Sequence, residues 1–306
     1  MELLGKTNID FIGKRNISFV ISSIIAILGI IGIIQIGRGA ANMGIDFSGG
    51  TAMQLKFAKH IPIDEIRTAL HKNGVAKVDL QEIKDGNKIL VKIDKNTSAA
   101  LGKSTDVVQN AFKKEFPDNA FTVESSTEIG PSIGDKLRKD TLIAVAISLL
   151  GIILYIAWRF DFKFGIGATV ATIHDCLAMF AAFYLLNKEI NLLFITAVLT
   201  IAGYSLTDTV VVFDRIRENL HKNLKGSMQN IFNMSINEVL SRTIVTSFTV
   251  FMAAASLFFF GGEVIHDFSF ALLVGVLVGT YSSVFVASPI VVLLENRAAA
   301  KQSVKS

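Results

Sequence analysis

Six apolar stretches divide the chain, and each is close to the length that a bilayer core requires. They run over 17–36, 142–158, 165–186, 190–213, 244–260 and 268–294, against about 20 residues for a spanning helix. The first stretch follows Lys14 and Arg15, as a secretory signal would. Its apolar run of 20 residues is longer than the core of a signal, and no convincing cleavage site follows. We therefore predict six membrane-spanning helices, of which the first is a retained anchor.

A polar stretch, 39–140, separates the first two spans and must fold outside the membrane. Alternating apolar residues predict strands, and helical spacing with Gly74 as a stop predicts a helix. The expected strands cover 51–57, 77–83, 88–93 and 120–125, and the expected helices cover 63–74 and 98–116. Asp85, Gly86 and Asn87 join the middle strands as a hairpin. The order β-α-β-β-α-β predicts a small ferredoxin-like α+β domain between the first two helices of a mainly α membrane protein.

The placement of Lys and Arg predicts the orientation, because short basic loops stay in the cytoplasm. The basic ends and loops hold Lys6, Lys14, Arg15, Arg159, Lys163, Arg215, Arg217, Lys222, Lys225, Arg297, Lys301 and Lys305. The opposite short loops, 187–191 and 261–267, hold one Lys between them. Three basic residues contradict this pattern, although long translocated domains follow the rule poorly; they are Lys136, Arg138 and Lys139.

We therefore expect a multi-pass membrane protein with both termini in the cytoplasm. Its parts would be a cytoplasmic N-terminus with the first span (1–38), a periplasmic domain (39–140), a bundle of five spans (141–294) and a cytoplasmic tail (295–306).

Composition supports the membrane assignment, with 51% apolar residues, four prolines and a positive mean hydropathy. The net charge of +4 reflects topology, and no nucleic-acid face is visible. The lone Cys176 excludes an intrachain disulfide or a cysteine metal cluster. No nucleotide loop, zinc spacing or outward Ser/His/Asp set is visible, so we expect no enzyme activity, cofactor or metal.

A carboxylate, Asp208, lies within the fourth span, in the stretch GYSLTDTVVVFDRIREN at 203–219. A charge there costs ~2.5 to 3.5 kcal/mol on insertion scales, so it should have a partner or a task. Gly203 and Thr207 would leave room and hydrogen bonds around it. Arg242, at the start of the fifth span, could lie at a similar depth. The two residues could form a proton site, a static ion pair, or a carboxylate beside an arginine that reaches to the surface.

His174 and Asp175 lie about ten residues into the third span, near the middle of the bilayer. Two titratable groups at that depth favour a proton relay over a locked hydrogen-bonded pair. Asp214 to Glu218, by contrast, read as a solvated helix end with local ion pairs, and the lone His221 has no assigned role.

Glycines mark two further features. The motif GIDFSGGT at 44–51 follows the first span and contains Gly44, Asp46, Phe47, Gly49 and Gly50. A structural turn with positive φ is favoured over a phosphate cradle, because no GxxxxGK[ST] sequence follows. In the sixth span a small residue recurs at every fourth position, at Ala271, Gly275, Gly279 and Ser283. This stripe favours close packing inside the bundle over a dimer interface.

Together these motifs resemble the SecD/SecF family of the bacterial protein-export machinery, a branch of the resistance-nodulation-division superfamily. The resemblance covers nearly the whole chain and includes 44–51, IGPSIG at 129–134, the HD pair at 174–175, 203–219, and SRTIVTS at 241–247. It implies a subunit that pairs with SecD and uses the proton motive force to complete preprotein movement at the SecYEG channel and its accessory Sec subunits.

By the same resemblance Asp208 is the proton-coupling carboxylate, Arg242 its arginine, and Asp175 the acidic member of the HD pair, with a further Asp supplied by SecD. The partners would be these Sec subunits, an unfolded preprotein, protons and membrane lipid, without nucleic acid. Two other functions stay open. One is a scaffold that conducts no protons, and the other is a small-molecule or lipid exporter of the same superfamily.

Overall fold

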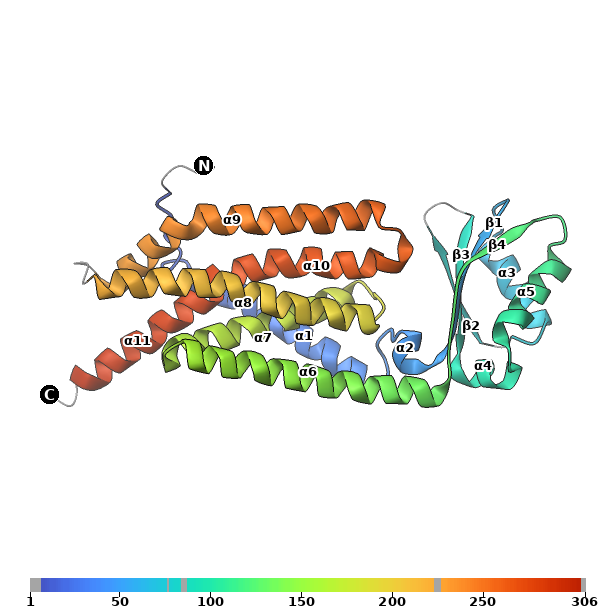
Figure 1. The fold of residues 1–306 in the computed structure, drawn as a ribbon, viewed down its shortest axis with the longest axis horizontal. Coiled ribbons are helices and arrows are strands. Elements are labelled where there is room, and N and C mark those ends of the chain that lie inside the picture. The colour runs from blue at the N-terminus through green and yellow to red at the C-terminus, as the bar shows by residue number, and fades with distance from the viewer. Residues whose placement is uncertain (1–6, 76, 84–86, 223–226, 304–306) are drawn as a thin grey trace. The chain divides into compact units, whose positions relative to one another are not determined.

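The computed structural model describes residues 7–75, 77–83, 87–222 and 227–303. The chain divides into two compact units. One, the helical unit, comprises 1–42 and 144–306, and the other, the sheet unit, comprises 43–143 (Figure 1). Each unit has an apolar core of its own.

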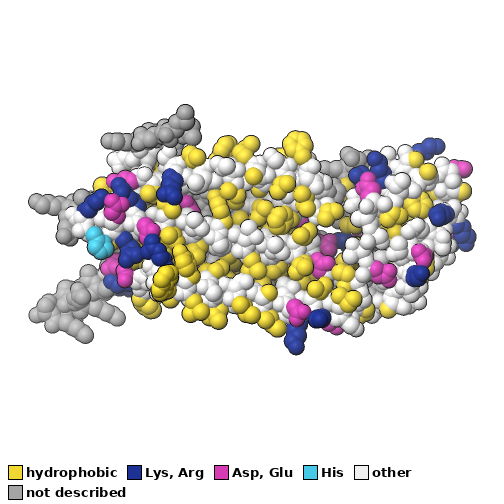
Figure 2. All heavy atoms as spheres, in the orientation of Figure 1, with side chains coloured by type: hydrophobic (Ala, Val, Ile, Leu, Met, Phe, Trp, Pro, Cys, Tyr) yellow, Lys and Arg dark blue, Asp and Glu magenta, His cyan; other side chains and the backbone are white. Residues whose placement is uncertain are grey.

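Six helical stretches within the described ranges are long and apolar enough to cross a membrane, as predicted. Five are single helices: α1 (Arg15–Gly37), α6 (Pro131–Arg159), α7 (Phe162–Leu185), α8 (Leu192–His221) and α9 (Met228–Phe260). The sixth combines α10 (Glu263–Ser282), a π-helical turn η1 (Ser283–Ala287) and α11 (Ser288–Ser303). On the face drawn in Figure 2, hydrophobic side chains cover the long helices and charged side chains gather near their ends.

Small residues bring the membrane helices close together. A Cβ on Gly29 of α1 would lie 2.2 Å from the carbonyl oxygen of Leu177 in α7, so only glycine permits this crossing. Where α7 approaches α8, phenylalanine rings fill the space: Phe164 and Phe213 meet edge to face with centroids 5.0 Å apart. Asn191 caps the start of α8 by accepting a hydrogen bond from the backbone N–H of Phe194 at 2.9 Å.

The sheet unit contains four antiparallel strands in the order β2-β3-β1-β4. They are β1 (Gly50–Phe57), β2 (Val78–Ile83), β3 (Lys88–Asp94) and β4 (Phe121–Ile129), with helices α2 (Ile45–Ser48), α3 (Ile63–Lys72), α4 (Lys95–Leu101) and α5 (Ser104–Glu115). The predicted ferredoxin-like order of elements is confirmed. The helix expected over 98–116 is two helices, because the chain turns at Gly102 with a φ of +73°.

The central strand β1 directs Met53, Leu55 and Phe57 into a core closed by α3 and α5. It pairs with β3 on one side and β4 on the other, so Gly50 faces both Asp94 and Ile129. The predicted hairpin pairs Ile83 with Lys88. Its turn residues Asp85 and Gly86 lie outside the described residues.

Candidate proton site in the membrane helices

The carboxylate of Asp208 is half-buried on α8 and is held by two hydroxyl groups from other elements. Thr243 of α9 donates a hydrogen bond to Oδ1 at 2.9 Å, and Ser283 of η1 donates to Oδ2 at 2.8 Å. A hydroxyl group can donate to a carboxylate and can also accept from a carboxylic acid. The same two partners can therefore serve Asp208 in either protonation state, and an arginine or lysine in this position could not.

Of the arrangements left open for Asp208 and Arg242, the structure does not form the direct ion pair. Within the described part of the chain, no ion pair joins the two side chains at 4.0 Å or less, and Arg242 is exposed. Successive residues on an α-helix are turned by about 100° around its axis, so only one of two neighbours can face α8. That neighbour is Thr243. Arg242 remains within electrostatic range of Asp208 but does not touch it.

Gly203 and Thr207 also lie elsewhere than expected. Both are exposed on the outer face of α8, and the Thr207 hydroxyl donates to the Gly203 carbonyl oxygen at 3.2 Å. Neither of them provides a hydrogen bond to Asp208, because residues one and five positions away lie on other sides of the helix.

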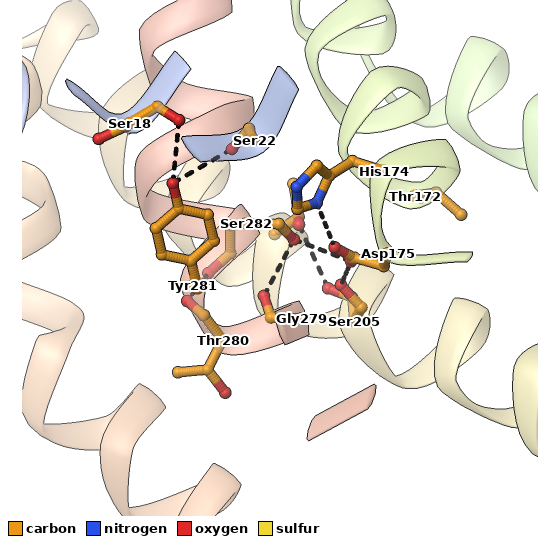
Figure 3. Close-up of polar contacts among 12 residues, drawn as sticks. Ser18, Ser22, Thr172, His174, Asp175, Ser205, Gly279, Thr280, Tyr281 and Ser282 are labelled. Carbon is orange, nitrogen blue, oxygen red and sulfur yellow. Dashed lines mark hydrogen bonds and ion pairs between the residues drawn. The ribbon is translucent and has the colours of Figure 1, made fainter. Parts of the chain in front are cut away.

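A second carboxylate, Asp175 of α7, is fully buried, with 0% of its surface exposed. Ser205 of α8 and Ser282 of α10 donate to its Oδ2 at 2.5 and 2.8 Å, as Figure 3 shows. The Nδ1 atom of His174 lies 3.1 Å from its Oδ1. The predicted HD pair is therefore a real contact, and three helices supply its surroundings.

The other ring nitrogen of His174 is different. His174 is 4% exposed, and its Nε2 is buried without a hydrogen-bond partner in the part of the chain that the structure describes. The ring lies beside Tyr281, with centroids 6.2 Å apart. The Tyr281 hydroxyl in turn contacts Ser18 and Ser22 of α1 (Figure 3). An imidazole that directs Nδ1–H to Asp175 presents Nε2 as a free base.

The glycine motif at 44–51 belongs to the sheet unit and has the positive φ angles that its sequence predicts. Gly49 and Gly50 have φ values of +70° and +127°. Gly44 is the N-cap residue of α2, which carries Asp46 in its first turn and buries Phe47. A Cβ on Gly134, in the IGPSIG segment, would lie 3.0 Å from the Gly49 nitrogen. The two motifs thus pack backbone against backbone where β1 begins.

The remaining sequence features have structural roles. The end of α8 carries the expected pairs Arg215–Glu218 and Lys222–Glu218, both at 2.6 Å. Asp214 pairs with Arg159 of α6 at 2.6 Å. In the small-residue stripe of α10, a Cβ on Gly275 would lie 2.5 Å from Ile201 Cγ1 of α8. Packing inside the bundle is confirmed at this position.

Sequence reasoning missed the hydroxyl residues that hold the two carboxylates: Thr243, Ser205, Ser282 and Ser283. Serine and threonine are common in membrane helices, where their hydroxyls bond to the carbonyl one turn back. Only Ser283 carried a signal, as a member of the small-residue stripe.

Comparison with known proteins places this arrangement in a family. Residues 107–297 match the family described as protein export membrane protein SecD/SecF, C-terminal. A protein translocase subunit SecF from Thermodesulfovibrio yellowstonii is 53% identical over 304 residues, which cover 99% of this chain and 100% of the relative. The chain belongs to the SecD/SecF family.

Other members of the SecD/SecF family agree. A protein translocase subunit SecF from Endomicrobium trichonymphae is 39% identical over 292 residues, covering 95% of this chain and 93% of the relative. The crystal structure of SecDF, a translocon-associated membrane protein from Thermus thermophilus, matches with a TM-score of 0.81 and 33% identity. The match covers 95% of this chain and 39% of that SecDF chain. This SecD/SecF protein is therefore a multi-pass membrane protein that spans less than half the length of the SecDF chain.

Proposed function

We propose that the chain pairs with SecD as a proton-driven subunit of the bacterial Sec export machinery. In this role it helps an unfolded preprotein leave the SecYEG channel, with both termini in the cytoplasm and the sheet unit in the periplasm. The observation that carries the proposal is the Asp208 carboxylate, which is held inside a membrane bundle by two hydroxyls that suit both of its protonation states.

A partner in the membrane is supported by one face of α8. Four small or hydroxyl-bearing residues on it are exposed at helical spacing: Thr196, Thr200, Gly203 and Thr207. Each threonine hydroxyl is satisfied by the carbonyl four residues earlier, at 2.8 to 3.2 Å. Such a face lets a second helix approach closely. Thr207 on this face precedes Asp208 in the chain, so a SecD helix packed there would contact the same turn of α8 that carries the carboxylate.

Arg242 supports the same partner. Its side chain is exposed on a membrane-spanning helix, and the described residues give it no ion pair. An unpaired arginine in a membrane is costly unless it reaches the surface or meets an anion. An aspartate of SecD that faced Arg242 would supply that anion and would complete the site on the side that this chain leaves open.

The sheet unit offers a further contact for a partner. Strand β4 lies at an edge of the sheet, where β1 is its one partner among the described strands. Its nine residues are mostly exposed, and an edge strand in general presents a row of unpaired backbone groups. Proteins usually cover or interrupt a long edge strand, so a second domain beside β4 fits the assembly that we propose.

The mechanism follows from the hydrogen bonds. When Asp208 is an anion, Thr243 and Ser283 both donate to it and draw α9 and η1 toward α8. Protonation removes the charge and changes one of these bonds, because the acid now donates a proton itself. A change in the helix contacts of α8 would then be transmitted to the sheet unit through the membrane helices that lead to it.

The test replaces Asp208 with asparagine, which keeps the shape and cannot be charged. Proton-driven export into membrane vesicles that contain SecD and this chain should fall to the level without a proton gradient. Asp214→Asn on the same helix is the matched control, because Asp214 pairs with Arg159 outside the hydroxyl site. Normal proton-driven export by Asp208→Asn would refute the proposal and would favour a scaffold.

A further inference from the structure

Two consecutive residues reach the carboxylates of Asp175, which is buried, and Asp208, which is half-buried. Ser282 donates to Asp175 Oδ2, and Ser283 donates to Asp208 Oδ2, each at 2.8 Å. Neighbouring side chains on a regular α-helix diverge by about 100°, so a single peptide bond here joins two sites that lie on different helices. We call Ser282 and Ser283 the serine pair.

Each hydroxyl of the serine pair also has a second acceptor. Ser282 lies 3.1 Å from the carbonyl oxygen of Gly279, and Ser283 lies 3.0 Å from that of Thr280. A hydroxyl donates only one proton. Each serine can therefore donate either to a carboxylate or to its own helix, and the charge on the carboxylate decides which acceptor is stronger.

The helix changes its geometry at this point. The π-helical turn η1 begins at Ser283, directly after the α-helical residue Ser282. Single π-turns within α-helices occur frequently at functional sites. The backbone hydrogen bonds of η1 differ from those of the α-helical turns on either side. A switch of either serine hydroxyl between a carboxylate and a backbone carbonyl therefore acts directly on the helix geometry at this point.

A second connection runs through α8. Ser205 holds Asp175, and Asp208 lies three residues later on the same helix. Residues three apart share one helix face. The two carboxylates are thus joined both by α8 and by the serine pair. A displacement of α8, or of the segment that carries the serine pair, would change the hydrogen bonds at both sites.

His174 identifies the Asp175 site as more than a structural network. Its Nε2 is a buried polar atom without a hydrogen-bond partner among the described residues. Buried polar groups are nearly always paired, and an unpaired one costs about 1 to 3 kcal/mol. An imidazole with Nδ1 directed at Asp175 and Nε2 free has the arrangement of a general base that can accept a proton.

We propose that His174 and Asp175 form a second proton-binding site, and that the serine pair couples its occupancy to that of Asp208. The inference rests on the proposed function, because it assigns a second site to the same proton-driven subunit. Ser282 and Ser283 are positioning residues, since they act through the two carboxylates. Among the residues that the structure describes, the titratable or charged side chains near the two sites are His174, Cys176, Tyr281 and Arg242.

The coupling can be measured by infrared spectroscopy of the full chain reconstituted with SecD. Carboxylic acid C=O bands are assigned by their loss in Asp175→Asn and Asp208→Asn, and the Asp208 band is followed with pH. With the serine pair present, Asp175→Asn should shift the Asp208 titration midpoint by about one pH unit. With Ser282→Ala and Ser283→Ala together, the same Asp175→Asn change should shift the Asp208 midpoint by no more than about a fifth of that amount.

Two controls separate a coupling role from a structural one. Ser269→Ala removes another buried hydroxyl of α10, which donates to the Ile265 carbonyl at 2.8 Å and contacts no carboxylate in the described residues. It should preserve the full shift. Ser282→Thr with Ser283→Thr restores both hydroxyls and should restore the shift.

An equal shift with and without the serine hydroxyls would overturn the inference, because it would show coupling through space alone. No shift in the native serine background would also overturn it. Export is assayed in parallel with Asp208→Asn. If export does not need Asp208 but the midpoints remain coupled, the proposed function fails while the coupling stands. If export needs Asp208 and the midpoints are independent, only the coupling fails.

Discussion

Replacing Gly50 with alanine should destabilise the sheet unit much more than the same change at Gly74. Both glycines have positive φ, at +127° and +91°. The surroundings differ, because a Cβ on Gly50 would lie 2.2 Å from the carbonyl oxygen of Ile93, whereas a Cβ on Gly74 meets nothing within 4 Å. Gly74→Ala therefore incurs only the left-handed backbone strain, about 1 to 2 kcal/mol.

Gly50→Ala incurs similar strain and also a collision with backbone. Strand β3 must move away by several tenths of an ångström or more, and this disturbs the Gly50–Asp94 pairing at the start of β1. Losing one or two ladder hydrogen bonds adds about 1 kcal/mol each. The free energy of unfolding should thus fall by about 2 to 4 kcal/mol, a large part of the 5 to 15 kcal/mol that is typical of a domain.

The measurement is urea denaturation of residues 43–140, expressed as a separate fragment and followed by far-ultraviolet circular dichroism. The fragment carries its own apolar core, centred on β1, α3 and α5. Gly50→Ala should lose at least twice the unfolding free energy that Gly74→Ala loses. Equal losses would refute the reasoning, because strain alone would then account for both glycines and the close approach of Ile93 would have no cost.

Two further predictions concern one residue in each unit. Asp94 caps α4 by accepting a hydrogen bond from the Thr97 backbone N–H at 2.7 Å, and this bond lowers the pKa of Asp94. Asp94→Ala should reduce the unfolding free energy by about 1 kcal/mol at pH 7. The difference in unfolding free energy between the variant and wild type should shrink as the pH falls below about 4 and passes through the lowered pKa of Asp94, because the protonated side chain no longer favours the cap. A difference that stays constant down to about pH 3 would contradict this prediction. In the helical unit, Gly275→Leu should force α10 away from Ile201, because the added side chain overpacks this contact. Overpacking costs about 1 to 3 kcal/mol of stability, so the melting temperature in detergent should fall. Gly151 is exposed, and a Cβ there meets nothing within 4 Å, so Gly151→Leu should not lower the melting temperature. Equal melting temperatures for the two variants would argue against close packing at Gly275.

Long elements with a strong hydrophobic pattern were predictable. Six apolar stretches became six spanning helices, and the order of strands and helices in 43–143 followed the expected alternation. Helix ends were less predictable. The second and fifth spans begin at Pro131 and Met228, well before their apolar stretches, because polar residues such as Lys139 and Asn233 continue the helix beyond them. Length of apolar sequence measures the membrane segment, and the helix itself can be longer.

The candidate site shows where sequence reasoning ends. Asp208 and Asp175 were identifiable because a carboxylate in an apolar segment is costly by itself. Their partners were not predictable. The residue of α9 that contacts Asp208 is Thr243, the neighbour of Arg242, because successive residues point in directions about 100° apart around the helix. An error of one position is below what a hydrophobic pattern can resolve on a helix whose apolar face is broad.

By itself, the sequence determined the number of spans, the small α+β domain between the first two, and the existence of ionisable groups within the membrane. These depend on composition and on local periodicity, which each segment carries alone. The tertiary structure decided that hydroxyls hold both carboxylates and that Ser282 and Ser283 join them through one peptide bond. Such contacts depend on how three or four helices are rotated against one another, and rotation is set by packing at many positions at once.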